Sequence, residues 1–95
     1  MKHLTENALK LFDAYVNDAG NWSGCPLIGG NVTLLGEEED RGLLTALKRA
    51  GLVYTNVDGG DAWLFFTKDG IQVAAQRGHD VSCLTCYRPW NQLSR

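Results

Sequence analysis

Apolar residues near the start of the chain recur at intervals of three and four, which is the spacing of one face of an α-helix. We predict a helix over residues 6–18, because Thr5 is a suitable N-cap and Gly20 is well placed to end the helix. The apolar positions are Ala8, Leu11, Phe12, Tyr15, Val16 and Ala19. The first predicted element is therefore an amphipathic helix.

The same spacing returns over residues 37–50. Acidic residues occupy the first turn and Lys48 and Arg49 the last, a polarity that complements the helix dipole, and Gly51 follows. The apolar side consists of Leu43, Leu44, Leu47 and Ala50. We predict a second amphipathic helix here.

A third, shorter helix is predicted over residues 68–77. Thr67 is a suitable N-cap, and Gly78 is placed to end the helix. The residues expected to face inward are Ile71 and either Ala74 or Ala75.

Between the second and third helices, the pattern changes to β-branched and aromatic runs. Residues 52–57 (LVYTNV) and 62–67 (AWLFFT) are separated by DGGD, whose glycines supply the positive φ angles of a tight turn. We predict an antiparallel β-hairpin. Residues 20–36, which connect the first two helices, are rich in glycine and predict an irregular segment with one short strand around residues 32–34.

Alternation along the second strand places apolar side chains on both faces of the hairpin. Trp63 and Phe65 point to one face, and Leu64 and Phe66 point to the other. The helices can cover only one face. The expected covers for the other are a protein partner, a second copy of the chain, or the C-terminal residues Tyr87 and Trp90.

Together these elements predict an α+β fold. We expect one domain over residues 1–78, with the order helix, irregular segment or short strand, helix, hairpin, helix, followed by a C-terminal tail over residues 79–95. A chain of 95 residues suffices for one small core.

Composition narrows the function classes. The chain is 44% hydrophobic and 21% charged, as in ordinary soluble globular proteins, and no apolar run approaches the roughly 20 residues that cross a bilayer. The N-terminal residues lack the pattern of a signal peptide. We therefore expect a cytoplasmic protein with no membrane partner. A net charge of −2 provides no overall positive field for nucleic acid.

Residues 40–75 contain LLTALKRAGLV (43–53), YTNVDGGDAWLFFT (54–67) and TKDGIQVA (67–74). These segments resemble the recognition helix, the wing and the following helix of a winged helix domain of MarR-like bacterial and phage transcription regulators. The resemblance implies a small winged helix domain that binds double-stranded DNA and regulates transcription. In that family a further helix precedes the recognition helix, whereas this chain has the glycine-rich GCPLIGGNVTLLG there.

If residues 37–50 are a recognition helix, the candidate DNA-binding residues are Arg41, Thr45, Lys48 and Arg49. The first three lie at i, i+4 and i+7 and share one exposed face. Arg and Lys bind phosphates or guanine, and Thr can bind a base edge.

A structural interpretation of the same helix is also open. The acids of EEEDR suit the positive end of the helix dipole, and Arg41 can pair with Glu37 or Glu38. Asp58 and Asp61 make the tip of the wing acidic, where a DNA-contacting wing usually carries Arg or Lys. These features favour binding to protein instead of DNA.

Three cysteines bear on metal and redox chemistry. His79, Cys83 and Cys86 have the spacing H-x3-C-x2-C, and Cys25 can supply a fourth ligand to tetrahedral zinc. Because one CxxC alone is weak evidence, we expect no cofactor, with this Cys3His set as the alternative. A disulfide framework is not expected from an odd cysteine count without an export signal.

No arrangement of a catalytic triad, phosphate loop or nucleotide fingerprint is present, so we expect no enzyme activity. The first interpretation is a DNA-associated, regulator-like winged helix protein that acts by binding. The alternative is a non-catalytic protein–protein interaction module on the same scaffold, such as a small phage or mobile-element protein that binds a host or regulatory protein. A homodimer is compatible with either function.

Overall fold

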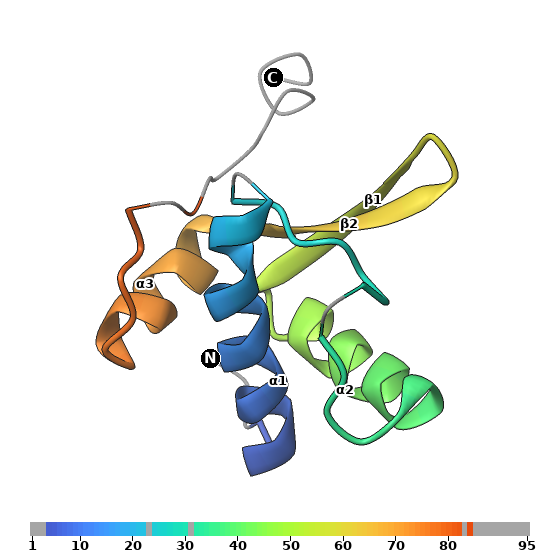
Figure 1. Cartoon of the computed structure of the whole chain (residues 1–95). Helices are drawn as coiled ribbons and strands as arrows, with labels where there is room; N and C mark the ends of the chain where they lie inside the picture. Colours follow the sequence, from blue (N-terminus) through green and yellow to red (C-terminus); the bar gives the residue numbers. More distant parts are fainter. Residues whose placement is uncertain (1–3, 23, 31, 83, 85–95) are drawn as a thin grey trace.

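The computed structural model describes residues 4–22, 24–30, 32–82 and 84. Within these ranges the chain forms three α-helices, one 3-10 turn and one antiparallel hairpin. The elements are α1 (Glu6–Asp18), η1 (Ala19–Asn21), α2 (Glu37–Arg49), β1 (Val53–Asp58), β2 (Asp61–Phe66) and α3 (Lys68–Gln76). In the view of Figure 1, α2 and α3 lie on opposite sides of α1, and the hairpin tip is directed away from the helices. The predicted α+β class is confirmed.

Helix α1 begins where its capping residue predicts. The Thr5 hydroxyl oxygen accepts a hydrogen bond from the backbone N–H of Ala8 at 3.1 Å, which satisfies one of the free donors of the first turn. All six predicted apolar positions of this segment are buried. The helix therefore stands at the centre of the core.

The predicted bounds of this helix, residues 6–18, are confirmed, but Gly20 does not end it in a left-handed conformation. The chain continues through the 3-10 turn η1, and the first left-handed glycine in the described ranges is Gly24, with φ of 96°. The reason is a side-chain clamp: the buried carboxylate of Asp18 accepts hydrogen bonds from Asn21 Nδ2 at 2.9 Å and Trp22 Nε1 at 3.0 Å. These bonds tighten the last turn before the chain leaves the helix.

The hairpin is confirmed. Strand β1 begins and ends one residue later than predicted, and β2 begins and ends one residue earlier. Gly59 and Gly60 have φ angles of 66° and 86°, as a two-residue type I′ turn requires. Leu52 stays outside β1 because its N–H bonds the carbonyl of Leu47, at the end of α2. Thr67 stays outside β2 because its hydroxyl caps α3 by accepting from Gly70 N–H at 2.9 Å.

The short strand predicted around residues 32–34 is wrong. The segment that pairs with the hairpin lies earlier: Leu27 bridges Trp63 of β2 in antiparallel fashion. Leu64 N–H donates to the Pro26 carbonyl, and Ile28 N–H donates to the Ala62 carbonyl, both at 2.9 Å. Residues 26–28 therefore run along the outer edge of β2, and Figure 1 shows this segment beside the strand.

The core lies between the helices and one face of the hairpin. Leu64 and Phe66 are fully buried on that face, and the Phe66 ring meets the Phe12 ring of α1 edge-on, with centroids 5.8 Å apart. From α2, Leu44 and Leu47 are buried as predicted. Each such side chain contributes about 1.5–3 kcal/mol by leaving water.

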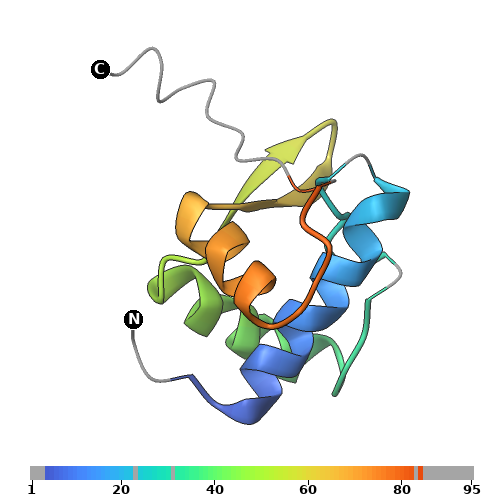
Figure 2. The same ribbon diagram turned by 90° about the vertical axis from the view of Figure 1, so that its left-hand side faces the viewer.

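Helix α3 closes the core from the other side, nearest the viewer in Figure 2. Ala74 is buried and Ala75 is exposed, which decides between the two predicted inward residues. Gly70 allows the helix to lie directly on the backbone of Leu52, because any Cβ at this position would overlap the Leu52 carbonyl oxygen. The helix ends at Gln76, one residue before the predicted end, and Gly78 follows in the left-handed conformation expected after a helix, with φ of 90°.

The outer face of the hairpin is partly covered by aromatic side chains of the described residues. Trp22 packs edge-on against Trp63, with ring centroids 5.6 Å apart. Tyr54 stacks on its cross-strand neighbour Phe65, with centroids 5.2 Å apart and ring planes 6° apart. The cover predicted from Tyr87 and Trp90 lies outside the described residues.

Residues 79–82 and 84 turn back against the helices. The His79 N–H bonds the Ala74 carbonyl, and Leu84 is buried in the core cluster. Across the described residues, no helix is both long enough and apolar enough to span a membrane.

Candidate functional site

The four predicted DNA-binding residues lie on the outer surface of α2. Arg41, Thr45, Lys48 and Arg49 are all exposed, whereas Leu44 and Leu47 on the opposite side face the core. The structure therefore brings the predicted residues together on one helix face. Their exposure permits contact with a ligand without identifying that ligand.

Two of these side chains already interact within α2. Arg41 Nη2 lies 3.4 Å from Glu37 Oε2, and the Thr45 hydroxyl donates to the Arg41 carbonyl at 3.0 Å. Both partners of the ion pair are largely exposed, so it contributes little stability. No ion pair of Lys48 or Arg49 occurs with any described residue, so the positive charge available to a ligand lies at the C-terminal end of α2.

The opposite end of α2 is strongly acidic. Its first turn consists of Glu37, Glu38, Glu39 and Asp40, and the first three are exposed. Gly36 at the N-cap provides no side-chain hydrogen bond, and the four carboxylates complement the positive end of this helix dipole. The exposed helix start presents negative charge to solvent.

Asp40 has a different role from its three neighbours. Its carboxylate turns back and accepts hydrogen bonds from the backbone N–H groups of Leu34, at 2.8 Å, and Leu35, at 3.0 Å. Both donors are thus bound to a side chain, which explains why this stretch is not a strand. The clamp also holds the side chain of Leu35 at the surface, where it is 51% exposed.

A groove of about 540 Å³ lies between α1, the connecting segment and α2. Its apolar lining comes from Tyr15, Ile28, Val32 and Leu44, and its polar lining includes Glu37, Asp40 and Arg41. Burial raises the pKa of the Tyr15 hydroxyl, and the carboxylates of Asp40 and Asp18 raise it further, so this group stays neutral in the physiological pH range. The groove combines an apolar floor with an acidic edge.

The position of this groove was not predictable from local patterns. Tyr15 appears in the sequence as one of several core positions of α1, and Asp40 as one of four acids at a helix start. Among the described residues of the connection between η1 and α2 no helix forms, and the groove lies along this connection.

The tip of the hairpin is the second surface that a winged helix would offer to DNA. Asp58 and Asp61 face each other there across the glycine turn, and both are exposed. The side chain of Val57 is 69% exposed beside them. As expected from the sequence, this tip is acidic.

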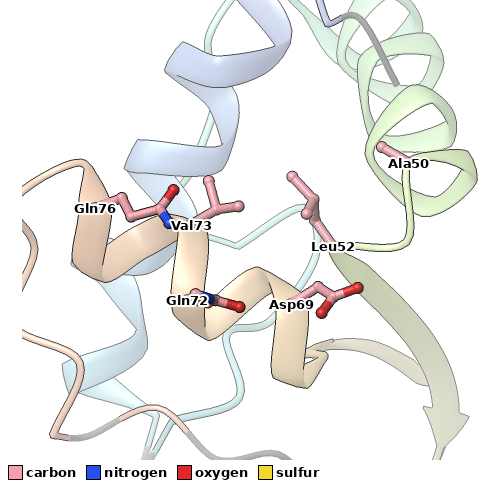
Figure 3. A pocket seen from close by; sticks show the side chains of 6 residues that line it. All are labelled: Ala50, Leu52, Asp69, Gln72, Val73 and Gln76. Atoms are coloured by element: carbon pink, nitrogen blue, oxygen red, sulfur yellow. The ribbon is translucent and has the colours of Figure 1, made fainter. Parts of the chain in front are cut away.

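A smaller cleft of about 290 Å³ lies between α3 and the junction of α2 with β1 (Figure 3). Ala50, Leu52 and Val73 form its apolar part, while Asp69 and Gln72 come from the exposed side of α3. In the described part of the chain it contains no group of metal-ligating side chains. Its chemistry does not single out a ligand.

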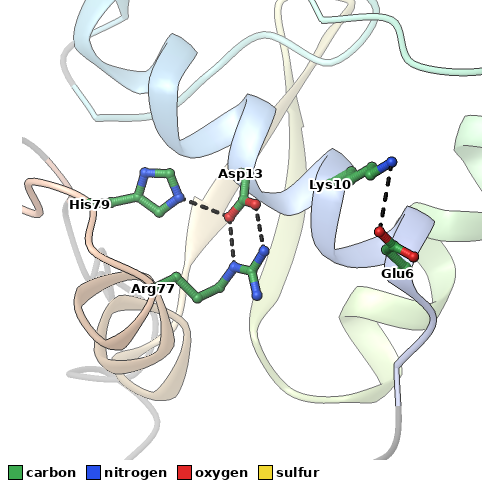
Figure 4. A network of polar contacts seen from close by, with 5 residues as sticks. All are labelled: Glu6, Lys10, Asp13, Arg77 and His79. Atoms are coloured by element: carbon green, nitrogen blue, oxygen red, sulfur yellow. Dashed lines mark hydrogen bonds and ion pairs between the residues drawn. The ribbon is translucent and has the colours of Figure 1, made fainter.

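The most complete polar network joins α1 to the end of α3 (Figure 4). Arg77 Nε and Nη2 donate to the two carboxylate oxygens of Asp13 at 2.8 and 2.6 Å, and His79 Nε2 lies 2.8 Å from Asp13 Oδ1. The hydrogen bond from Arg77 lowers the pKa of Asp13, with a further contribution from His79. This network was not predicted, because its members are 64 and 66 positions apart.

The network bears on the predicted zinc set. His79 contacts Asp13, and the thiol of Cys25 is half-buried, which raises its pKa. Cys83 and Cys86 lie outside the described residues. In the part of the chain that is described, no group of three His, Cys, Asp or Glu side chains is arranged to hold a metal ion.

Comparison with known proteins adds no relative from which a role could be transferred. No protein-family model, no curated protein and no solved structure matches this chain.

Proposed function

We propose that this chain is a non-catalytic binding domain on a winged helix-like scaffold, and that it binds a basic, amphipathic segment of another protein at the start of α2. The observation that carries the proposal is the set of exposed carboxylates in the first turn of α2, Glu37 to Glu39, of which Glu37 lines the apolar groove. The element order of helix, edge segment, helix, hairpin and helix supports the scaffold.

Charge favours a protein ligand over a DNA duplex. Helix-turn-helix proteins place the N-terminal residues of their recognition helix against the base edges. In α2 this end carries four acids, and the tip of the wing carries Asp58 and Asp61. Both elements would bring negative charge toward phosphates, which raises the electrostatic cost of binding.

The groove supplies the apolar half of the proposed site. Val32 and Leu44 in its floor accommodate apolar side chains, and Glu37 at its edge can pair with Lys or Arg. The exposed side chain of Leu35 adds an apolar contact outside the groove. A ligand that buries apolar side chains and presents cations on its other face fits all of these features.

The test uses the 15N-labelled chain and two synthetic peptides, one of alternating Leu and Lys and one of alternating Leu and Glu. We expect the Leu–Lys peptide to shift the amide resonances of Tyr15, Val32 and residues 37–44. The Leu–Glu peptide should leave these resonances in place. Shifts centred on another surface, or an equal response to both peptides, would contradict the proposal.

A matched pair of variants tests whether binding depends on the acids at the start of α2 or on any exposed acid of the chain. Replacing the three glutamates in Glu37→Gln, Glu38→Gln and Glu39→Gln should weaken binding of the Leu–Lys peptide by about tenfold or more. Glu6→Gln removes an exposed acid from α1 and should leave the affinity unchanged. Equal effects of the two changes would remove the acidic start of α2 from the site.

DNA association is the second candidate, and one observation favours it. Arg41, Thr45, Lys48 and Arg49 share the exposed face of α2 and can approach a duplex together. In this alternative the basic C-terminal half of α2 binds phosphates, and binding weakens steeply with salt.

A further inference from the structure

The two edges of the hairpin differ in their hydrogen bonding. Residues 26–28 cover the edge of β2, where Leu64 N–H and the Ala62 carbonyl are both bonded. Because alternate residues of a strand direct their backbone groups to opposite sides, Trp63 and Phe65 must face β1. Their cross-strand partners are Asn56 and Tyr54.

The same alternation identifies the open edge. If Tyr54 and Asn56 direct their backbone groups toward β2, then Val53, Thr55 and Val57 direct theirs away from the sheet. Among the described residues, no backbone hydrogen bond to these outward groups is present. The open edge is therefore the backbone of Val53, Thr55 and Val57 along β1.

This edge lacks several of the features with which proteins prevent strand addition. Such edges are usually blocked by lysine, proline or a bulge. The sequence of β1, VYTNVD, contains neither residue, and its pairing with β2 is continuous from Val53 to Asp58. Val57 in addition exposes 69% of its surface at this edge.

We propose that the open edge of β1 pairs in antiparallel fashion with the same edge of a second copy of this chain, around a two-fold axis at Thr55. The outward residues read Val, Thr, Val in both directions. An isologous interface requires such self-complementarity. Thr55 then pairs with Thr55 of the copy, and Val57 pairs with Val53 of the copy.

The charges at the hairpin tip are consistent with this orientation. Antiparallel pairing about Thr55 places Asp58 opposite Leu52 of the copy, so the two acidic tips lie at opposite ends of the joined sheet. A parallel arrangement would place the two acids side by side. Thr–Thr and β-branched cross-strand pairs also contribute favourably in sheets.

Sedimentation velocity on the full 95-residue chain tests the pairing. We expect a concentration-dependent dimer of twice the 10.5 kDa chain mass. Val57→Lys adds a charge at the edge, and Thr55→Pro removes an outward donor that β1–β2 pairing does not use. Each should weaken dimerisation by at least about tenfold. Val57→Thr keeps the β-branched shape and should dimerise like the parent chain.

Hydrogen exchange on the unmodified chain gives a readout that does not depend on any variant folding. The amides of Thr55 and Val57 should gain protection as concentration rises, while Asn56, bonded within the hairpin, stays protected throughout. A monomer at all concentrations up to about 1 mM would overturn the proposal. So would a dimer that Val57→Lys leaves intact, or one in which the Thr55 and Val57 amides gain no protection.

Discussion

The side of the molecule where α1 meets α3 and the side formed by α2 use their charged residues in opposite ways. Between α1 and α3, the carboxylate of Asp13 is bonded on both oxygens by Arg77 and contacted by His79. On α2, the carboxylates of Glu37, Glu38 and Glu39 are exposed to solvent, and Glu37 pairs with Arg41, whose side chain is also largely exposed. Similar residue types thus join two helices in one region and remain available to a ligand in the other.

This difference separates structural charges from candidate binding charges. An acid whose oxygens are saturated by an intramolecular partner stabilises the fold and has little capacity left for a ligand. An exposed acid that is supported only by a helix dipole contributes a few tenths of a kcal/mol to about 1 kcal/mol to the helix. We therefore propose that a ligand binds on the α2 side of the molecule, whereas the charges between α1 and α3 stabilise the tertiary structure.

The largest expected effect concerns the hairpin face that packs against the helices. Phe66→Ala should destabilise the domain by about 3–5 kcal/mol, because the Phe66 ring is fully buried against Phe12. Phe65→Ala should cost less, because that ring stacks on Tyr54 at the outer face. Urea denaturation monitored by circular dichroism measures both. Equal losses would show that the two faces are packed equally tightly.

The same substitution, Gly to Ala, should change the stability of the domain in opposite directions on the two sides of the molecule. Gly70→Ala should destabilise the domain by about 1–3 kcal/mol, because its Cβ would overlap the Leu52 carbonyl oxygen. Gly42→Ala on α2 should stabilise it by up to about 1 kcal/mol, because no atom lies within 4 Å of the new methyl group and Ala favours the helix. Thermal unfolding distinguishes them, and a destabilised Gly42→Ala variant would contradict the open environment assigned to α2.

Removing the carboxylate of Asp13, between α1 and α3, should reduce the stability of the domain more than removing an exposed carboxylate. Asp13→Asn should cost about 1–2 kcal/mol, because the amide carries no negative charge and keeps only one oxygen that can accept from Arg77. The control is Glu6→Gln, which removes the exposed 3.8 Å pair with Lys10 (Figure 4) and should change stability by less than about 0.5 kcal/mol. Denaturant midpoints at neutral pH measure the two differences.

The same carboxylate predicts a pH dependence. Because the folded state lowers the pKa of Asp13, its contribution is fully present above the ordinary value of 3.8 and is lost as pH falls through the lower folded-state pKa. The stability difference between the parent chain and Asp13→Asn should therefore shrink as pH falls below 3.8 and through the lowered folded-state pKa of Asp13. A difference that stays constant over this range would exclude the ionised carboxylate as its source.

The helices and the hairpin were predictable because their signals are local. Thr5 and Thr67 each cap a helix by binding an amide three residues later. Gly59 and Gly60 are adjacent and adopt the positive φ angles of the turn between the strands. The edge segment was misplaced because its pairing with the hairpin links Leu27 to a residue 36 positions later, Trp63. No periodicity within the connecting segment encodes that contact.

The candidate site was predictable only as a set of exposed residues. Helical spacing correctly placed Arg41 and Lys48 on the outer face of α2, and the acids of EEEDR at its start. The groove depends on packing of the connecting segment against Tyr15 and on the clamp that Asp40 makes with the backbone. Both arise from tertiary structure, so the sequence pattern alone could not indicate an apolar floor beside the acidic helix start.

The measurement that most directly tests the assignment of α2 is a titration of the 15N-labelled chain with mixed-sequence duplex DNA at low salt. We predict no shifts among residues 37–50 or 54–66 even at about 1 mM DNA, which exceeds the usual non-specific dissociation constants of about 10⁻⁴ to 10⁻⁶ M. Salt-sensitive shifts centred on Arg41, Thr45 and Lys48 would contradict the account and establish the basic face of α2 as a DNA-binding surface.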